Sequence, residues 1–270
     1  MRLKDKVVII TGGTSGIGEA CALIFGREGS KIVITGRSKE KLDSSSRTLE
    51  ENGIEFLAVL ADAGLEADNK RMVEETLRVF GRIDILINNA GISMRALFQD
   101  LDLEVFRKVM DTNFWGTVYA TKYCLPSIIA AKGSVIGISS INGFRGTPAR
   151  TAYTASKYAM NGFFEALRTE VMHEGVHVMV AAPGFTASNI RNNALTANGK
   201  TQGESPRDEG KMMTSTQVAE EILKATQRRK RDLVLTVQGK VVVFLNKWMP
   251  GIMDGVVFRE MAKEKDSPFH

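Results

Sequence analysis

The chain has 270 residues, a length that a single open α/β domain often reaches. With 43% hydrophobic and 25% charged residues it is not a disordered chain, and its formal charge of +5 is spread along the sequence. Two cysteines and three scattered histidines exclude a disulfide framework and give no spaced metal site.

The N-terminus and one internal basic run bear on location and partners. Asp5 interrupts the basic start, and the apolar run that follows is too short for a secretory signal, so we expect a cytoplasmic protein. The run RRKR at 228–231 is interpreted as the end of a helix that complements its dipole. An anionic cofactor or a membrane surface is the second interpretation, and no nucleic-acid partner is expected.

Strand-like and helix-like patterns alternate along the chain. The β-branched run at 6–11 is typical of a parallel strand buried on both faces, and similar runs follow at 31–35, 55–61, 83–88, 133–140 and 176–184. Helical periodicity occurs between them, at about 17–24, 38–52, 72–80, 103–131 and 151–171. This alternation predicts an α/β fold, a Rossmann-type doubly wound parallel sheet of about seven strands with helices on both faces. Ligands bind such sheets at the carboxyl ends of the strands.

We expect residues 1–270 to form a single domain with two special segments. The stretch 184–214 is polar and flexible and follows a strand end directly, so we interpret it as a lid over the substrate rather than as a disordered loop. The stretch 238–270 extends the fold at the C-terminus.

The first predicted strand ends in the glycine-rich sequence TGGTSGIG. Gly12, Gly16 and Gly18 allow the backbone to turn tightly and to approach a pyrophosphate, which would lie at the N-terminus of the next helix. Thr14, Ser15 and Ile17 lie in the same turn. A plain joint between strand and helix is the alternative, because the spacing differs by one residue from the common dinucleotide fingerprint.

The second predicted strand ends in TGRSK, where dinucleotide-binding folds that use NAD have an acid for the ribose 2′-hydroxyl. Here Arg37 and Ser38 occupy that place, and a guanidinium favours a 2′-phosphate through charge-assisted hydrogen bonds. The sequence therefore predicts NADP(H) as cofactor. The alternative is that Arg37 is a surface charge beside a helix cap.

Six short motifs occur in order: TGGTSGIG, NNAG at 88–91, DTN ending in Asn113, ISS ending in Ser140, YTASK at 153–157 and PGF at 183–185. Together they resemble the short-chain dehydrogenase/reductase family, in its common single-domain branch, over about residues 4 to 240. The segment after the second strand looks like the NADP(H)-preferring, hydroxysteroid-dehydrogenase-like members.

The resemblance implies catalytic roles for four residues. Tyr153 matches the general acid/base, Lys157 its partner, Ser140 the hydroxyl that orients substrate, and Asn113 the residue that holds a water in a proton relay. The spacing of Tyr153 and Lys157 places both on one helix face, where an ammonium favours the phenolate. On their own the two would be read as an exposed pair, and Asn113 as a side chain that bonds only backbone groups.

The resemblance also implies further cofactor contacts. Asp62 matches an adenine-contacting acid, with a helix cap as the alternative. The remaining contacts are Asn89, Ala90, Gly91, Pro183, Gly184, Thr186 and Ser188, besides Tyr153 and Lys157 themselves. Thr186 replaces a β-branched apolar residue and Ser188 replaces a threonine of the family pattern.

These residues predict an NADP(H)-dependent oxidoreductase that interconverts a ketone and a secondary alcohol of lipophilic or 3-oxoacyl type, and no metal is required. A 3-oxoacyl carrier-protein reductase is the first alternative, and an NADP-binding sensor or scaffold without turnover is the second. Apolar residues that could line the substrate pocket are Met94, Phe98, Phe144, Phe185, Met212 and Met213.

We expect a homodimer or homotetramer that pairs through the helices at 103–131 and 152–174, because they carry more apolar residues than one sheet face needs: Tyr119, Tyr123, Phe163, Phe164 and Leu167. The C-terminal stretch has apolar positions at Val241, Leu245, Trp248, Ile252 and Val256. Pocket cover or oligomer packing is favoured for it, and peripheral membrane contact is the less favoured alternative.

Overall fold

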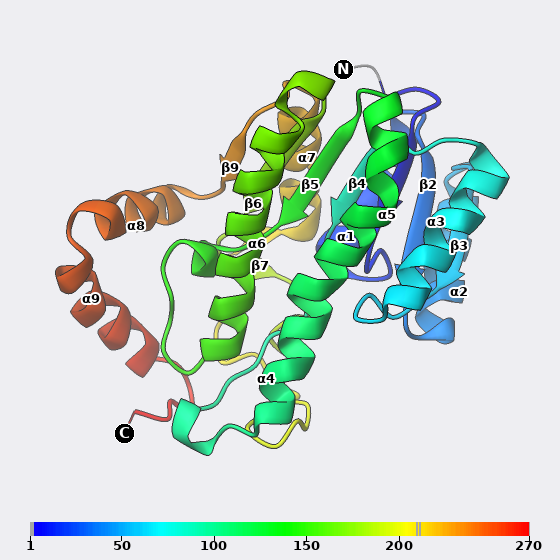
Figure 1. Ribbon diagram of the computed structural model, residues 1–270. Helices are drawn as coiled ribbons and strands as arrows, with labels where there is room; N and C mark the ends of the chain where they lie inside the picture. Colours follow the sequence, from blue (N-terminus) through cyan, green and yellow to red (C-terminus); the bar gives the residue numbers. More distant parts are fainter. Residues whose placement is uncertain (1–2, 209, 211, 270) are drawn as a thin grey trace.

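The structure is a computed structural model that describes residues 3–208, 210 and 212–269. One parallel sheet of seven strands runs through it in the order β3-β2-β1-β4-β5-β6-β9 (Figure 1). The strands are β1 (Val7–Ile10), β2 (Lys31–Gly36), β3 (Phe56–Leu60), β4 (Ile85–Asn88), β5 (Ser134–Ile138), β6 (His177–Ala182) and β9 (Asp232–Val234). The predicted doubly wound parallel sheet is confirmed.

Helices cover both faces of the sheet. Side chains of α1, α2 and α7 pack on one face, and those of α3, α5 and α6 on the other, where α5 and α6 lie in front in Figure 1. The helices are α1 (Gly16–Arg27), α2 (Lys39–Glu51), α3 (Glu66–Phe80), α4 (Leu103–Met110), α5 (Gly116–Ala130), α6 (Thr151–Glu170), α7 (Ser215–Gln227), α8 (Val237–Trp248) and α9 (Pro250–Ala262).

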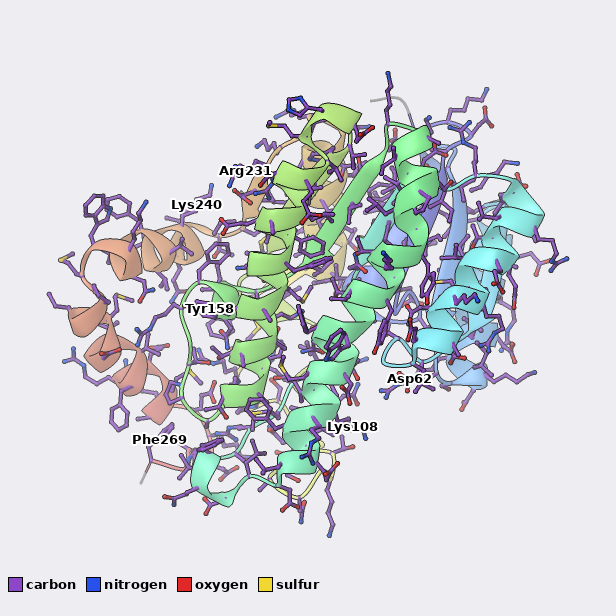
Figure 2. All side chains as sticks on the ribbon, viewed as in Figure 1. Asp62, Lys108, Tyr158, Arg231, Lys240 and Phe269 are labelled. Atoms are coloured by element: carbon purple, nitrogen blue, oxygen red, sulfur yellow. The ribbon has the colours of Figure 1, made fainter. Side chains whose placement is uncertain are left out.

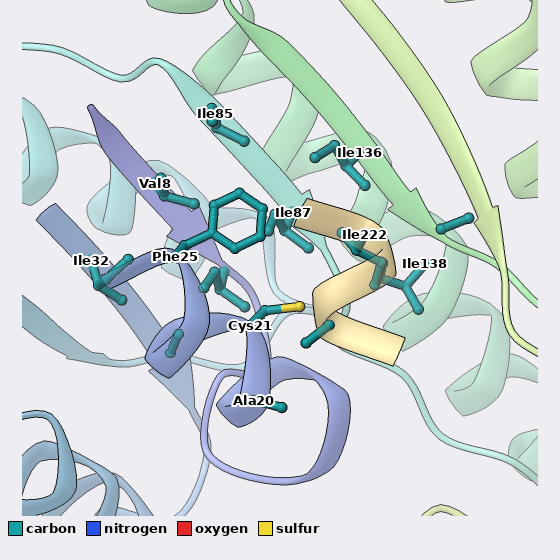
Figure 3. Close-up of a cluster of buried hydrophobic side chains, with 14 of the residues drawn as sticks. Val8, Ala20, Cys21, Phe25, Ile32, Ile85, Ile87, Ile136, Ile138 and Ile222 are labelled. Atoms are coloured by element: carbon teal, nitrogen blue, oxygen red, sulfur yellow. The ribbon is translucent and has the colours of Figure 1, made fainter. Parts of the chain in front are cut away.

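The two cores follow from the alternation of side chains along each strand. In β1, Val8 and Ile10 point to the core under α1 and α7, whereas Val7 and Ile9 point to the opposite core. Figure 3 shows Phe25 of α1 packed among Val8, Ile87 and neighbouring side chains of the first core. Because both faces are covered, the strands read as continuous apolar runs.

The long helix predicted over 103–131 is not continuous. α4 ends at Met110, a π-helical turn spans Asp111–Trp115, and α5 begins at Gly116. A Cβ on Gly116 would lie 2.6 Å from the carbonyl oxygen of Ala63, so this helix passes close to the chain after β3. The extra residue of a π turn commonly marks a functional position, and Asn113 lies in it.

Two of the residues expected at an oligomer interface are instead part of the chain's own core. Phe164 and Leu167 are buried against the sheet, and a Cβ on Gly137 would lie only 2.0 Å from the ring of Phe164. Tyr119, Tyr123 and Phe163 remain partly exposed. The sequence pattern did not distinguish them, because a wide apolar stripe on a helix can serve a core or an interface.

All strands present their carboxyl ends at one edge of the sheet. Figure 2 shows Asp62, which follows β3, at this edge and Arg231, which precedes β9, at the opposite one. The chain steps outward from β1 to β3 and then returns to place β4 beside β1, which makes a topological switch point between β1 and β4.

The amino ends of the central strands meet at a buried carboxylate, Asp84. Its oxygens accept hydrogen bonds from the Lys6 ammonium at 2.9 Å, the Arg82 guanidinium at 2.6 and 2.8 Å, and the backbone N–H of Val7 at 3.0 Å. Burial by itself raises the pKa of Asp84, but these hydrogen bonds outweigh it and hold the pKa below its usual value.

We predict that Asp84→Asn lowers the free energy of unfolding at pH 7 by about 2 kcal/mol, because both partly exposed cations lose a buried partner. The folded pKa is lowered, so the carboxylate stabilises the fold above its unfolded-state pKa of about 3.9, and this contribution is lost as the pH falls through the folded value. Urea unfolding at pH 7 and pH 3 measures the difference between variant and wild type, which should shrink at pH 3. Asp102→Asn, an exposed cap without a side-chain bond, is the control and should be nearly neutral. An equal effect of the two substitutions would contradict the prediction.

Candidate active site

A cleft of about 1020 Å³ runs along the carboxyl edge of the sheet. Every residue that the sequence nominated for catalysis or cofactor binding lines it, except Gly18 and Asn113, which lie behind its wall. The lining residues from that set are Gly12, Thr14, Ser15, Gly16, Ile17, Arg37, Ser38, Asp62, Asn89, Ala90, Gly91, Ser140, Tyr153, Lys157, Pro183, Gly184, Thr186 and Ser188.

The glycine-rich loop forms the floor of the cleft beside β4. Gly12 and Gly16 have positive φ of 65° and 56°, which favours glycine at both positions. A Cβ on Gly12 would lie 2.9 Å from the Cα of Ala90, and one on Gly18 would lie 2.3 Å from the carbonyl oxygen of Gly12. The glycines therefore place no side chains over the backbone around the start of α1, and its N–H groups at the helix N-terminus are suited to bind a phosphate.

The hydroxyl of Thr11 attaches this loop to the end of β4. It accepts hydrogen bonds from the backbone N–H groups of Asn89 at 3.0 Å and Ala90 at 3.1 Å. The amide of Asn89 in turn donates to the carbonyl oxygens of Thr11 and Gly12, both at 3.0 Å. Asn89 and Ala90 are thus held where they line the cleft.

The ends of β2 and β3 form a corner of opposite charges. A guanidinium nitrogen of Arg37 lies 3.7 Å from a carboxylate oxygen of Asp62, and both side chains are partly exposed to the cleft. Asp62 is not the cap of α3, which is Leu65; it accepts instead from the backbone N–H of Gly64 at 2.9 Å. Ser38 caps α2 by accepting from the N–H of Lys41 at 3.3 Å.

Lys41 also lines the cleft, beside Arg37, and sequence reasoning did not single it out. Its position three residues after the cap places its side chain near that of Ser38, which was the available signal. With Arg37 it supplies two cations at the carboxyl end of β2.

Tyr153 lies in the first turn of α6, and its pKa is raised. Burial is the main cause, while a side-chain hydrogen bond with Ser140 and the positive charges of Arg150 and Arg191 lower it in part. The direction is opposite to the lowering that we expected from Lys157. Of the two cations that act on the phenol, Arg150 is the N-cap residue just before α6 and Arg191 belongs to the 184–214 segment, and both line the cleft.

Lys157 is buried directly below Tyr153, one helical turn further along α6. Its ammonium donates to the carbonyl oxygen of Ile138 at 2.9 Å and lies 5.7 Å from the centre of the Tyr153 ring. Burial lowers the pKa of Lys157 to about 8. The group is therefore charged at neutral pH and close to losing its proton just above it.

Both the oxygen and the nitrogen of the Asn113 side chain form hydrogen bonds within the protein. Its oxygen accepts from the N–H of Ile92 at 2.8 Å, and its nitrogen donates to the carbonyl oxygen of Ile92 at 3.0 Å and to the hydroxyl of Ser156 at 2.9 Å. It joins the π turn to the chain after β4 and to α6. The two contacts with Ile92 are the kind that we expected if Asn113 served only to bond backbone groups. The role of Asn113 in a water relay stays a prediction.

The 184–214 segment closes one side of the cleft and is tied to the C-terminus. It begins with the small strand β7 (Thr186–Ala187), which pairs with β8 (Met213–Thr214). Arg207 stacks on the ring of Phe185 at 4.1 Å and donates to Glu264 at 2.7 Å. Its function as a lid stays a prediction.

Glu264 is almost wholly buried and gathers three arginines. Besides Arg207, it accepts from Arg150 at 3.2 Å and lies 3.5 Å from Arg95. The C-terminal stretch is thereby linked to the turn that carries Tyr153. Sequence reasoning missed this cluster, because its members are far apart along the chain.

Of the apolar residues expected at the pocket, Phe185, Met212 and Met213 line the cleft. Met94 is wholly buried in a separate small core, and Phe98 is exposed. Phe144 packs against the core between the sheet and helices α3, α5 and α6. The C-terminal helices supply other lining residues, among them Val242, Met253, Val257 and Met261. In the described part of the chain, no group of His, Cys, Asp or Glu is placed to hold a metal ion.

Comparison with known proteins agrees with this geometry. Residues 6–199 match the family model described as short chain dehydrogenase. The chain is 36% identical over 274 residues to "Dehydrogenase/reductase SDR family member 7B" of Mus musculus, covering 98% of this chain and 84% of that one. It is 33% identical over 268 residues to "Dehydrogenase/reductase SDR family protein 7-like" of Drosophila melanogaster, covering 97% and 82%.

Solved structures show the same fold. A short chain dehydrogenase/reductase from Burkholderia phymatum, determined in complex with NAD, superposes with a TM-score of 0.84 at 21% identity and covers 94% of this chain and 96% of that one. LigD from Sphingobium superposes with a TM-score of 0.78 at 24% identity. From the family model and the relatives, this chain belongs to the short-chain dehydrogenase/reductase family of oxidoreductases.

Proposed function

We propose that this protein is an NADP(H)-dependent oxidoreductase that interconverts a ketone and a secondary alcohol. The observation that carries the proposal is the joint placement of Tyr153, Ser140 and Lys157 in one cleft with a glycine-rich loop at a helix N-terminus. The Burkholderia relative was solved with NAD, which supports a nicotinamide cofactor in the same fold.

The residues of this cleft fit such a cofactor. The bare backbone at Gly12 and Gly16 would hold the pyrophosphate, Asp62 the adenine, and the ammonium of Lys157 the hydroxyls of the nicotinamide ribose. Bound NADPH supplies hydride to the carbonyl carbon. Arg37 and Lys41, with no carboxylate at the end of β2 itself, favour a cofactor that carries a 2′-phosphate.

The chain's own residues handle the proton. In the reductive direction Tyr153 donates its phenol proton to the substrate oxygen, and its raised pKa keeps that proton available at neutral pH. The hydroxyl of Ser140 steadies the oxygen as negative charge develops. The positive charges of Lys157, Arg150 and Arg191 around the phenol stabilise the phenolate that remains.

The substrate is proposed to be lipophilic, since the 184–214 segment and helices α8 and α9 contribute apolar side chains to the cleft beside their polar ones, among them Phe185, Met212, Val242, Met253 and Val257. A carrier-protein substrate is second, because Glu174 ends the turn after α6, where a basic docking residue would help. A cofactor-binding sensor without turnover is the third candidate function, because such a protein would not need Tyr153 and Lys157 together and this chain has both.

We predict that the protein binds NADPH more tightly than NADH and that Arg37→Asp weakens NADPH binding by about 2 kcal/mol, because it removes a charge-assisted hydrogen bond and adds repulsion. Titration followed by cofactor fluorescence measures both affinities. Arg47→Asp is the control: it makes the same charge change on an exposed face of α2 outside the cleft. Equal affinity for the two cofactors, or an equal loss in both variants, would refute the preference.

Tyr153→Phe is expected to abolish turnover while NADPH affinity stays nearly intact, since the phenol acts on the substrate oxygen and not on the cofactor. Lys157→Met should lower both the turnover and the affinity for NADPH. NADPH oxidation with carbonyl substrates of graded chain length, together with cofactor titration, separates these effects. Tyr158→Phe, an exposed tyrosine of the same helix (Figure 2), should retain full activity.

The same experiment has a pH readout. Alcohol oxidation needs the phenolate, so its rate should rise with pH through the apparent pKa of Tyr153. Lys157→Met and Arg150→Met each remove a positive charge near the phenol, and the step should therefore move to higher pH. Normal turnover of Tyr153→Phe, or a step that stays in place in both cation variants, would disprove this role for Tyr153.

A further inference from the structure

Helices α8 and α9 form an arm, residues 237–262, that extends from the sheet at one side of the molecule (Figure 1). Its inner side is packed: Met253, Val257 and Met261 form a small core with Val242 and Leu245. The arm is tied to the body by Asn246, which donates to the carbonyl oxygen of Phe144 at 2.9 Å. The arm therefore has a defined inner and outer side.

The outer side of α8 is an apolar stripe. Val237, Val241, Phe244 and Trp248 recur at intervals of four, three and four residues, so they lie along one helix face. All four are exposed, Phe244 by 63% and Trp248 by 68%. Met249 and Ile252 continue the exposed apolar surface through the turn and into α9.

The two helices of the arm differ in charge. α8 contains no Asp or Glu, and its Lys240 (labelled in Figure 2) and Lys247 are exposed, each directly before a residue of the stripe. Both acids of α9 are paired with arginines of the body: Asp254 lies 2.6 Å from Arg145 and Glu260 lies 3.5 Å from Arg207. The outer side of α8 thus combines exposed apolar residues with positive charge only.

We propose that the outer side of this arm binds the surface of a lipid bilayer that carries anionic headgroups. A stripe of Val, Phe and Trp flanked by lysines is the pattern of a helix that lies in the interface plane, with the ammonium groups toward the headgroups. None of the helices in the described part of the chain is long and apolar enough to cross a bilayer, so the contact is peripheral.

A second copy of the chain is a poorer occupant for this surface. A two-fold interface brings the same patch of both subunits together, so Lys240 and Lys247 would approach their own copies with no carboxylate on α8 to pair them. An anionic bilayer offers the opposite charge. The inner side of the same arm lines the cleft with Val242, Met253 and Val257, so the arm joins the lipid surface to the cleft.

Flotation of the full chain with phosphatidylcholine vesicles, with and without about one third phosphatidylglycerol, tests the proposal. The protein should float with the anionic vesicles and much less with the neutral ones, and added salt should weaken the binding. In the Trp115→Phe background, Trp248 is the one remaining tryptophan, so its emission should shift to shorter wavelength with anionic vesicles.

Val241→Glu should lower the vesicle affinity roughly tenfold or more, because it places a charge in the apolar stripe. Val79→Glu is the matched control, a valine of α3 that is similarly exposed, 46% against 48%, and it should bind as the wild type does. The Lys240→Glu/Lys247→Glu double variant changes only exposed charges and should also lose binding. Thermal unfolding confirms that each variant is folded.

Equal binding by Val241→Glu and the wild type would overturn the proposal. So would a folded protein that ignores anionic vesicles but forms a dimer in light scattering that Val241→Glu dissociates, since that result assigns the stripe to a second copy. The assay needs neither cofactor nor turnover, so its outcome is independent of the proposed enzymatic activity.

Discussion

The hydroxyl of Thr11 is the contact on which the cofactor side of the cleft depends. It stands at the end of β1 and accepts the N–H groups of Asn89 and Ala90 at the end of β4, the two strands that meet at the switch point. With the strand ends tied, the glycine loop passes so close to Ala90 that a side chain at Gly12 would not fit. The glycine-rich turn is therefore shaped by sheet topology as much as by its glycines.

At the other side of the cleft, the environment of Tyr153 depends on positive charges near its buried phenol. Burial raises the pKa of Tyr153, and a hydrogen bond with Ser140 and the positive charges of Arg150 and Arg191 oppose that rise. Arg150 is the N-cap residue of α6, and Arg191 belongs to the segment after β6. Lys157, on the same helix as Tyr153, lies 5.7 Å from the centre of the phenol ring. This arrangement supports the proposed reaction, in which the phenol gives its proton to the substrate and the cations stabilise the anion left behind.

Glu264 connects the C-terminal stretch and the 184–214 segment to this site. One buried carboxylate near the C-terminus accepts hydrogen bonds from Arg207 of the 184–214 segment and from Arg150, beside the turn that carries Tyr153. Removing a single partner from such a cluster leaves buried charge without compensation. The residues just after α9, the 184–214 segment and the start of α6 are thus coupled in energy, although they are separate in sequence.

The sequence alone determined the class of fold, because buried parallel strands need continuous apolar runs and crossover helices need a period of 3.6 residues, and both patterns are local. It also nominated residues that line the cleft: the glycine-rich loop, Arg37 and the Tyr153–Lys157 pair by their place in the pattern, and most of the others through the resemblance of six short motifs to a known family. Only the tertiary structure decided what depends on contacts between distant segments. It directed the side chain of Asn113 to the backbone of Ile92, placed Arg150 and Arg191 near Tyr153, and buried Phe164 in the chain's own core. It also left one side of α8 uncovered, because an apolar stripe does not by itself say whether protein, lipid or water lies against it.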